Sequence, residues 1–258
     1  MQPDRAELIT WATGAGAIVR QYFGRRLDVK EKGYADLVTE ADYRSEAYLI
    51  DCIRRVFPEH TIVTEESGHL QGEGDHRWYI DPLDGTLNYA HGMPFFAVSL
   101  AYAYGEQVQL GVIYDPIRQE CFSAERGKGA WLNEEPICVS QVAELIDSLL
   151  VTGFPGDVHT SEDNNLDHYG RLTRLCQGVR RLGSAALDAA YVASGRLDGF
   201  WELRVGAWDI AAGGLIVEEA GGVVTSFEGR RQYMSPPYSL VAANPLLHPK
   251  LLAALHED

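Results

Sequence analysis

Apolar residues at helical spacing predict two helices near the start of the chain. The first is expected to be capped by Asp4 and to end near Gly24. Its apolar positions are Leu8, Trp11, Ala12, Ala15, Ile18, Val19 and Tyr22. Thr39 is expected to cap a second helix that runs to about Phe57. Asp42 falls in the first turn of this second helix, where a carboxylate often serves only as a cap.

Short runs of β-forming residues follow the second helix. The predicted strands cover residues 61–64, 78–80, 95–104, 108–114, 121–124 and 130–132. The strand at 78–80 should stop at Asp81, because Pro82 has no N–H to donate to a sheet. The first half of the chain therefore predicts two helices that cover a mostly antiparallel sheet.

Beyond about residue 140, strands and helices alternate. The predicted strands are residues 149–151, 180–182, 197–202, 223–224 and 240–242, and the predicted helices are 161–176, 184–195, 207–220 and one from 245. Such alternation is typical of α/β structure. We expect an α/β fold with an N-terminal α+β part at 1–140 and a C-terminal α/β part at 141–258.

The helix predicted at 207–220 is apolar nearly all round, so it should be buried at the centre of the protein. Asp209 lies in its first turn. A buried carboxylate is costly unless it caps a helix, pairs with a cation or binds a metal. The pattern alone leaves these three roles open.

The chain is organised around residues 78–86, where a buried strand delivers Asp81 and then Asp84-Gly85-Thr86. A tight turn that opens a helix offers free N–H groups, which bind phosphate. Two carboxylates three positions apart can hold divalent cations beside that phosphate. The alternative for Asp84 is that it merely caps a helix at the end of a strand.

Composition and charge restrict the classes of partner and substrate that the protein can bind. The chain has 258 residues, 46% of them apolar, and a formal net charge of −15. That charge argues against nucleic acid or an anionic membrane as partner, and a phosphate ester would be repelled unless cations were bound. No apolar run is long enough to span a membrane, and the start does not resemble a signal peptide. Four widely separated cysteines suggest free thiols and a cytoplasmic location.

Four carboxylates are predicted at the ends of strands or helices: Glu65, Asp81, Asp84 and Asp209. Because these are hard oxygen ligands without a cysteine or histidine cluster, they favour Mg²⁺ or Mn²⁺ over zinc. Carboxylates around two cations can activate water against a phosphate ester. Gly-x-Ser-x-Gly and P-loop motifs are absent, so nothing suggests a covalent intermediate.

Several motifs together resemble the inositol monophosphatase family. They are Lys32-Gly33-x-x-Asp36-Leu37-Val38-Thr39-x-x-Asp42, Glu65-Glu66-Ser67, Asp81-Pro82-Leu83-Asp84-Gly85-Thr86, Gly183-Ser184-Ala185-Ala186, Gly199-Phe200-Trp201-Glu202 and Trp208-Asp209. They run in order from about residue 30 to 222. The resemblance implies a five-layer α/β/α/β/α sandwich and a Mg²⁺-dependent, lithium-sensitive phosphatase, commonly a homodimer.

The resemblance also implies a role for each matching residue. Glu65, Asp81 and the carbonyl of Leu83 would hold a first metal ion; Asp81, Asp84 and Asp209 a second; and Glu65 a weaker third. Thr86, bonded to Asp42, would orient the attacking water, which Glu65 would help to deprotonate. The N–H groups of Gly85 and Thr86 would bind phosphate. The residues expected to face the alcohol of the substrate are Asp84, Ala185, Glu202 and Asp209.

The expected reaction is hydrolysis of a small polyol or sugar phosphate, with inositol 1-phosphate as first choice. Relatives within this resemblance act on fructose 1,6-bisphosphate, histidinol phosphate or 3′-phosphoadenosine 5′-phosphate, and these remain alternatives. A catalytically idle protein-binding member is a further one. Thr64 stands where the family often has Gly, and the family's loop lysine corresponds to Lys30 or Lys32.

Overall fold

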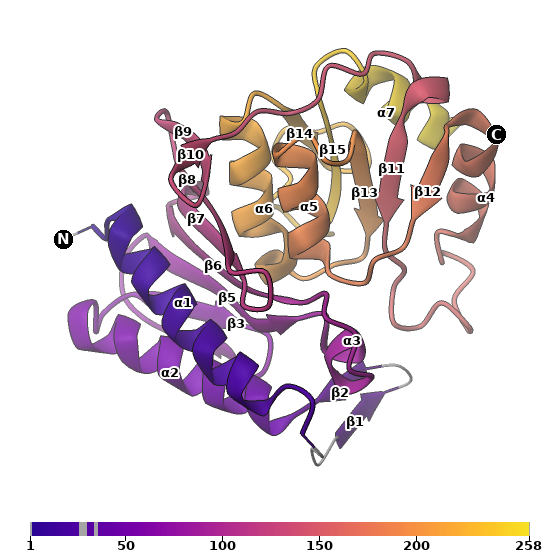
Figure 1. Cartoon of the computed structure of the whole chain (residues 1–258). Coiled ribbons are helices and arrows are strands. Elements are labelled where there is room, and N and C mark those ends of the chain that lie inside the picture. Colours follow the sequence, from indigo (N-terminus) through magenta and orange to yellow (C-terminus); the bar gives the residue numbers. More distant parts are fainter. Residues whose placement is uncertain (1, 26–29, 34–35, 258) are drawn as a thin grey trace.

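A computed structural model describes residues 2–25, 30–33 and 36–257. Its helices are α1 (Arg5–Tyr22), α2 (Glu40–Val56), α3 (Thr86–Ala90), α4 (Leu166–Leu175), α5 (Ala185–Ala193), α6 (Ala207–Glu219) and α7 (His248–His256), with a 3₁₀ turn at Leu145–Asp147. A small hairpin pairs β1 (Lys30–Gly33) with β2 (Asp36–Val38). Two larger sheets and these helices stack as the five layers expected from the resemblance (Figure 1).

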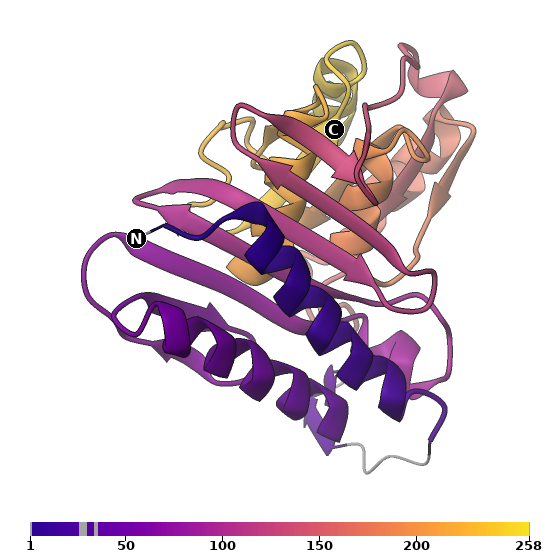
Figure 2. The same cartoon turned by 60° about the vertical axis from the view of Figure 1, so that its left-hand side comes forward.

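The first sheet has eight strands in the order β10-β9-β8-β7-β6-β5-β3-β4. Their bounds are β3 (Thr61–Thr64), β4 (Gly68–Leu70), β5 (His76–Asp84), β6 (Ala97–Tyr104), β7 (Gln107–Asp115), β8 (Glu120–Glu125), β9 (Gly129–Leu132) and β10 (Glu135–Pro136). Only the β3–β5 pair is parallel, as expected of a mostly antiparallel sheet. Figure 2 shows α1 and α2 side by side across one face of this sheet.

The second sheet has five strands in the order β12-β11-β13-β15-β14. Their bounds are β11 (Leu149–Thr152), β12 (Gly178–Arg180), β13 (Gly199–Leu203), β14 (Val223–Thr225) and β15 (Ser239–Ala243). Helices α5 and α6 lie between the two sheets, and α4 and α7 cover the outer face of the second sheet (Figure 1). One hydrophobic core therefore joins residues from both halves of the chain. The division of the chain at residue 140 remains a prediction.

The caps inferred from the sequence are present. Asp4 accepts a hydrogen bond from the N–H of Glu7 at 2.8 Å and starts α1, and Thr39 caps α2. Helix α6 is buried between the sheets, as its apolar sequence predicts. Among the described residues, no helix is long and apolar enough to cross a membrane.

Several predicted boundaries are wrong; strand β12, for example, spans Gly178–Arg180 instead of 180–182. Strand β5 continues past Pro82 to Asp84, because a bulge between Asp81 and Asp84 removes the need for a donor at the proline. The helix expected at 161–176 begins only at Leu166. The segment before it is a loop held by Arg204, whose guanidinium bonds Asp157 and Ser161. The last helix begins at His248 instead of 245.

Candidate active site

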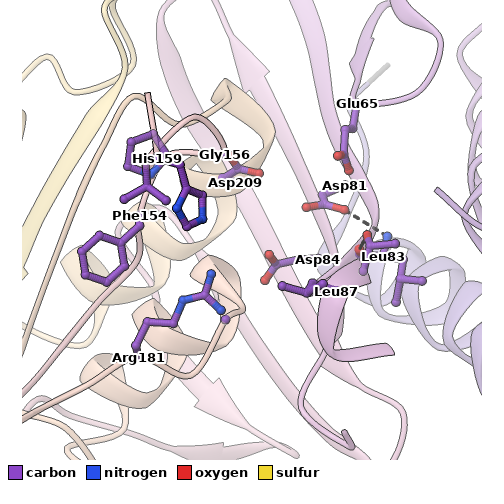
Figure 3. Close-up of a pocket in the computed structure, with 15 residues that line it drawn as sticks. Glu65, Asp81, Leu83, Asp84, Leu87, Phe154, Gly156, His159, Arg181 and Asp209 are labelled. Carbon is purple, nitrogen blue, oxygen red and sulfur yellow. Dashed lines mark hydrogen bonds between the residues drawn. The ribbon is translucent and has the colours of Figure 1, made fainter. Parts of the chain in front are cut away.

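A cavity of about 480 Å³ opens where β5 ends and α6 begins. Figure 3 shows Glu65, Asp81 and Asp84 on one side of it and Asp209 facing them from α6. Every residue that the sequence assigned to metal or phosphate lines this cavity: Glu65, Asp81, Leu83, Asp84, Gly85, Thr86 and Asp209. The fold thus brings together positions up to 144 residues apart, as the difference between 209 and 65 shows.

The end of β5 shapes the floor of the cavity. Asp81 is 2% exposed, and its Oδ1 accepts a hydrogen bond from the N–H of Leu83 at 3.0 Å (Figure 3). Gly85 follows with a φ of 94°, and a Cβ there would lie 3.1 Å from the carbonyl oxygens of Phe95 and Gly183. This left-handed, crowded turn requires glycine before α3 begins at Thr86.

Asp84 joins the first sheet to α5. Its Oδ2 accepts hydrogen bonds from the Ser184 hydroxyl and, at 2.8 Å, from the N–H of Ala186. Its Oδ1 accepts from the N–H of Ala185 at 3.2 Å. Asp84 therefore binds the free donors at the start of α5. Asp84 therefore caps a helix, but this helix starts after Ser184, which is 100 residues further along the chain.

Asp209 caps helix α6, which is one of the three roles that the sequence left open for it. Its Oδ2 accepts a hydrogen bond from the N–H of Gly206 at 2.6 Å. Burial is the largest cause that raises the pKa of Asp209 well above its usual range, and the negative charge of Asp84 adds to it. Capping and a place in the carboxylate cluster are therefore compatible.

The carboxylates repel one another. Burial, followed by the charges of Glu65, Asp84 and Asp209, raises the pKa of Asp81 well above its usual range. Burial also raises the pKa of Asp84 to about 6, although its hydrogen bonds to α5 oppose that shift. Such a cluster attracts cations, since a bound cation relieves both the burial and the repulsion.

The donor set fits a hard divalent cation, because it consists of carboxylate oxygens and the Leu83 carbonyl. The described residues contain no ready-made group of three or more acidic, histidine or cysteine side chains close enough to hold a metal. Asp81, Asp84 and Asp209 are each held instead by N–H groups. The carboxylates therefore line one cavity, but the described residues do not form a complete metal site.

Asp42 lies behind the cavity and contacts it through Thr86. The Thr86 hydroxyl is 3.2 Å from Asp42 Oδ1 and 3.0 Å from the Leu83 carbonyl oxygen. Asp42 Oδ2 accepts from the N–H of Thr39 at 2.8 Å, so one carboxylate caps α2 and contacts Thr86. Burial raises the pKa of Asp42 to about 6.

A second cavity, of about 150 Å³, adjoins the first. All four residues expected to face the alcohol of the substrate line it: Asp84, Ala185, Glu202 and Asp209. Glu202 packs directly against Gly153; a Cβ there would lie 1.9 Å from Glu202 Oε1, so the carboxylate would have to shift. Burial and the charge of Asp84 raise the pKa of Glu202 to about 8, while Arg181 opposes the shift.

Sequence reasoning missed other residues of the two cavities. Phe154, His159 and Arg181 line the larger one (Figure 3), and their isolated positions in the sequence gave no signal. Asp188 lines the smaller one; it is 1% exposed, and its Oδ1 has no hydrogen-bond partner in the described part of the chain. An acidic residue in an otherwise apolar helix, residues 185–193, was the available signal for Asp188. The side chains of Lys30 and Lys32 lie outside the described residues.

Comparisons with known proteins agree with the resemblance. The model of the inositol monophosphatase family matches residues 1–258. An inositol-1-monophosphatase from Synechocystis is 45% identical over 259 residues, covering 97% of this chain and 90% of that protein. The Nus factor SuhB of Escherichia coli K12 is 44% identical over 233 residues, covering 90% and 87%. The structure of inositol monophosphatase from Anabaena superposes with a TM-score of 0.88 at 44% identity, covering 97% and 94%.

Proposed function

This chain belongs to the inositol monophosphatase family of metal-dependent phosphoric monoester hydrolases, and from that premise we propose that it hydrolyses a small polyol phosphate monoester. Inositol 1-phosphate is the first candidate substrate. One observation carries the proposal: the carboxylates of Glu65, Asp81, Asp84 and Asp209 line a single cavity with the Gly85–Thr86 turn. A carboxylate cluster beside free N–H groups suits a phosphate ester accompanied by cations.

We assign the metal ligands as the sequence suggests. Glu65, Asp81 and the Leu83 carbonyl would hold one Mg²⁺; Asp81, Asp84 and Asp209 a second; and Glu65 a weaker third, with Mn²⁺ as a possible substitute. Bound Mg²⁺ supplies positive charge to the phosphate and lowers the pKa of water. The remaining chemistry belongs to the side chains and backbone of the chain.

Thr86 and Asp42 are proposed to orient the attacking water. A hydroxyl has one proton, so when Thr86 donates it to Asp42, its lone pairs are available to accept a hydrogen bond from water. The Thr86 hydroxyl lies 3.2 Å from Asp42 Oδ1 and 3.0 Å from the Leu83 carbonyl oxygen; with that carbonyl on a metal ion, Asp42 would be the acceptor. Glu65, on the same side of the cavity, would take the proton from the water. The N–H groups of Gly85 and Thr86 would bind the phosphate oxygens.

The smaller cavity is proposed to hold the alcohol part of the substrate. Its lining by Asp84, Ala185, Glu202 and Asp209 supports a substrate with several hydroxyl groups, because carboxylates accept hydrogen bonds from hydroxyls. A featureless alkyl or aryl group would offer Glu202 no hydroxyl from which to accept a hydrogen bond, so that contact would be lost.

The experiment is a panel of phosphate esters assayed with and without Mg²⁺. We expect inositol 1-phosphate to have the highest kcat/KM, and fructose 1,6-bisphosphate, histidinol phosphate and 3′-phosphoadenosine 5′-phosphate to have lower values. If one of these three other esters has a higher kcat/KM, it would replace inositol 1-phosphate as the proposed substrate, and the proposed reaction would stay the same. If no ester is hydrolysed, the alternative of a catalytically inactive, protein-binding protein would be favoured. The Escherichia coli relative is named as a Nus factor, which makes this alternative worth testing.

We also propose a homodimer without nucleic acid or membrane as partner. The net charge of −15 supports the exclusion of both anionic partners. Analytical ultracentrifugation tests the dimer, and a sedimentation coefficient that matches one 28.6 kDa chain would contradict it.

A further inference from the structure

Helix α2 contacts the candidate active site through three residues near its N-terminus. Asp42 contacts Thr86, and the hydroxyl of Ser45 donates to the carbonyl of Pro82 at 2.8 Å. The third residue is Glu46, which is 3% exposed and lines neither active-site cavity. Nothing in the proposed reaction uses this buried carboxylate, so its presence needs another explanation.

Glu46 binds the turn that follows β3. Its Oε2 accepts hydrogen bonds from the Thr64 hydroxyl, from the N–H of Glu66 at 3.0 Å and from the N–H of Ser67 at 3.4 Å. Its Oε1 accepts from the Ser67 hydroxyl. The donors stand on both sides of Glu65 in the sequence, so one side chain holds the Thr64 side chain before that residue and the backbone after it.

We propose that Glu46 is a positioning residue that holds the Glu65 carboxylate in place to receive a metal ion. The inference rests on the proposed function, in which Glu65 is a metal ligand. A turn at the end of a strand has N–H groups without sheet partners and would otherwise be mobile. A carboxylate accepts hydrogen bonds at both of its oxygens, so Glu46 can pair with all four donors together.

The hydrogen-bond pattern distinguishes two substitutions at this position. In Glu46→Gln, the amide oxygen can take the place of Oε2 and accept from Thr64, Glu66 and Ser67. The amide nitrogen then takes the place of Oε1 and donates to the Ser67 hydroxyl, which can rotate to accept. The Gln variant therefore keeps the turn, whereas Glu46→Ala leaves its buried donors unpaired.

Calorimetric titration of Mg²⁺ into the metal-free protein tests the proposal. We expect Glu46→Ala to weaken Mg²⁺ binding about 10- to 100-fold, as is typical when a partner that orients a ligand is removed. Glu46→Gln should bind Mg²⁺ like the parent. The matched control is Leu49→Ala, which opens a cavity in the core one turn along the same helix but removes no hydrogen bond to the turn after β3, because a leucine side chain makes none. It should lower the melting temperature and leave the Mg²⁺ affinity unchanged.

Hydrogen exchange of the Glu66 and Ser67 amides in metal-free protein gives a second readout, independent of the metal. These amides should lose protection in Glu46→Ala and keep it in Glu46→Gln. If Glu46→Ala does not fold, Thr64→Val and Ser67→Ala each remove one hydroxyl donor and should give smaller losses of affinity in the same direction.

The outcomes separate the two proposals. A parent protein that binds no Mg²⁺ would overturn the proposed function and, with it, the metal-positioning role. Parental Mg²⁺ affinity in a folded Glu46→Ala variant would overturn the role of Glu46 alone. An equal loss of affinity in Leu49→Ala would also overturn it, because general destabilisation of α2 would then explain the effect.

Discussion

Asp84 and Thr86 are separated by one residue but contact different parts of the protein. Asp84 binds the start of α5 and lines both cavities, whereas Thr86 contacts Asp42 behind the larger cavity. Their proposed roles, metal ligand and water orientation, predict different consequences of substitution.

Asp84→Asn removes a negative charge from the proposed metal site, so Mg²⁺ affinity and kcat should both fall sharply. Thr86→Ala should keep most of the Mg²⁺ affinity but lower kcat by about 10²–10⁴-fold, the range typical of general acid–base catalysis. Calorimetric titration with Mg²⁺ and initial rates on both variants make the comparison. Equal Mg²⁺ affinity in the two variants would contradict the assignments.

Glu202 should affect the choice of substrate without affecting the chemistry. A hydrogen bond between a neutral and a charged group contributes about 1.5–3 kcal/mol, so above about pH 8, where Glu202 is ionised, its loss should lower kcat/KM about 10- to 100-fold. Glu202→Gln should therefore weaken hydrolysis of inositol 1-phosphate while that of p-nitrophenyl phosphate barely changes. A parallel fall for both esters would instead give Glu202 a role in the metal site or the fold.

Among the residues that line the cavities, those within short motifs could be predicted from the sequence, and isolated ones could not. Glu65, Asp81, Asp84 and Asp209 stand at the ends of elements, where a carboxylate is conspicuous. Asp188 reaches the smaller cavity because α5 packs between the two sheets, and Arg181 reaches it from the segment between β12 and α5. Capping was the alternative to metal binding for Asp84, and only the tertiary fold shows that the capped helix is α5.

At the scale of elements, the spacing of α5 and α6 determines how the two cavities are built. Helix α5 supplies Ala185 and α6 supplies Asp209, both to the smaller cavity. The two helices approach closely at Gly213, where a Cβ would lie 2.6 Å from the Cβ of Ala189. A side chain at this position would have to push the helices apart.

Gly213→Ala should therefore destabilise the protein by about 1–3 kcal/mol, as overpacking of a core does. The matched control is Gly170→Ala in α4, where nothing lies within 4 Å of the added Cβ. It should instead stabilise the protein by up to about 1 kcal/mol through higher helix propensity. Urea unfolding measures both variants, and a stability gain in Gly213→Ala would contradict the close packing.

Elements with local signals were predicted well. Helices α1, α2 and α5 have side-chain caps, and α6 has a long apolar sequence. Strand β5 was predicted too short, since a bulge depends on the partner strand and is invisible in one sequence. Helix α4 was predicted too long, because Arg204 from another part of the chain holds the preceding segment as a loop.

At the scale of the whole molecule, the buried carboxylates make the metal-free protein sensitive to pH. Glu202 has a pKa raised from 4.5 to about 8, and Asp42 and Asp84 have pKa values raised to about 6. The folded chain thus keeps protons that the unfolded chain has already released. Stability is therefore lost as the pH rises towards and through the raised values.

With a chelator present, the melting temperature should fall between pH 5.5 and 8.5. Glu202→Gln should flatten the upper part of this decline, from about pH 6.5, because its amide does not titrate. Addition of Mg²⁺ at pH 8.5 should raise the melting temperature by mass action. Calorimetric melts at fixed protein concentration measure all three, and a melting temperature that rises with pH would contradict the shifts.

The central claim is that bound metal at these carboxylates carries the hydrolysis. The most direct test follows phosphate release from inositol 1-phosphate after chelation and then during titration with Mg²⁺. We expect no turnover in excess chelator, full recovery with Mg²⁺ in the parent protein, and no comparable recovery in Asp84→Asn. Full turnover by the parent protein in excess chelator would contradict it.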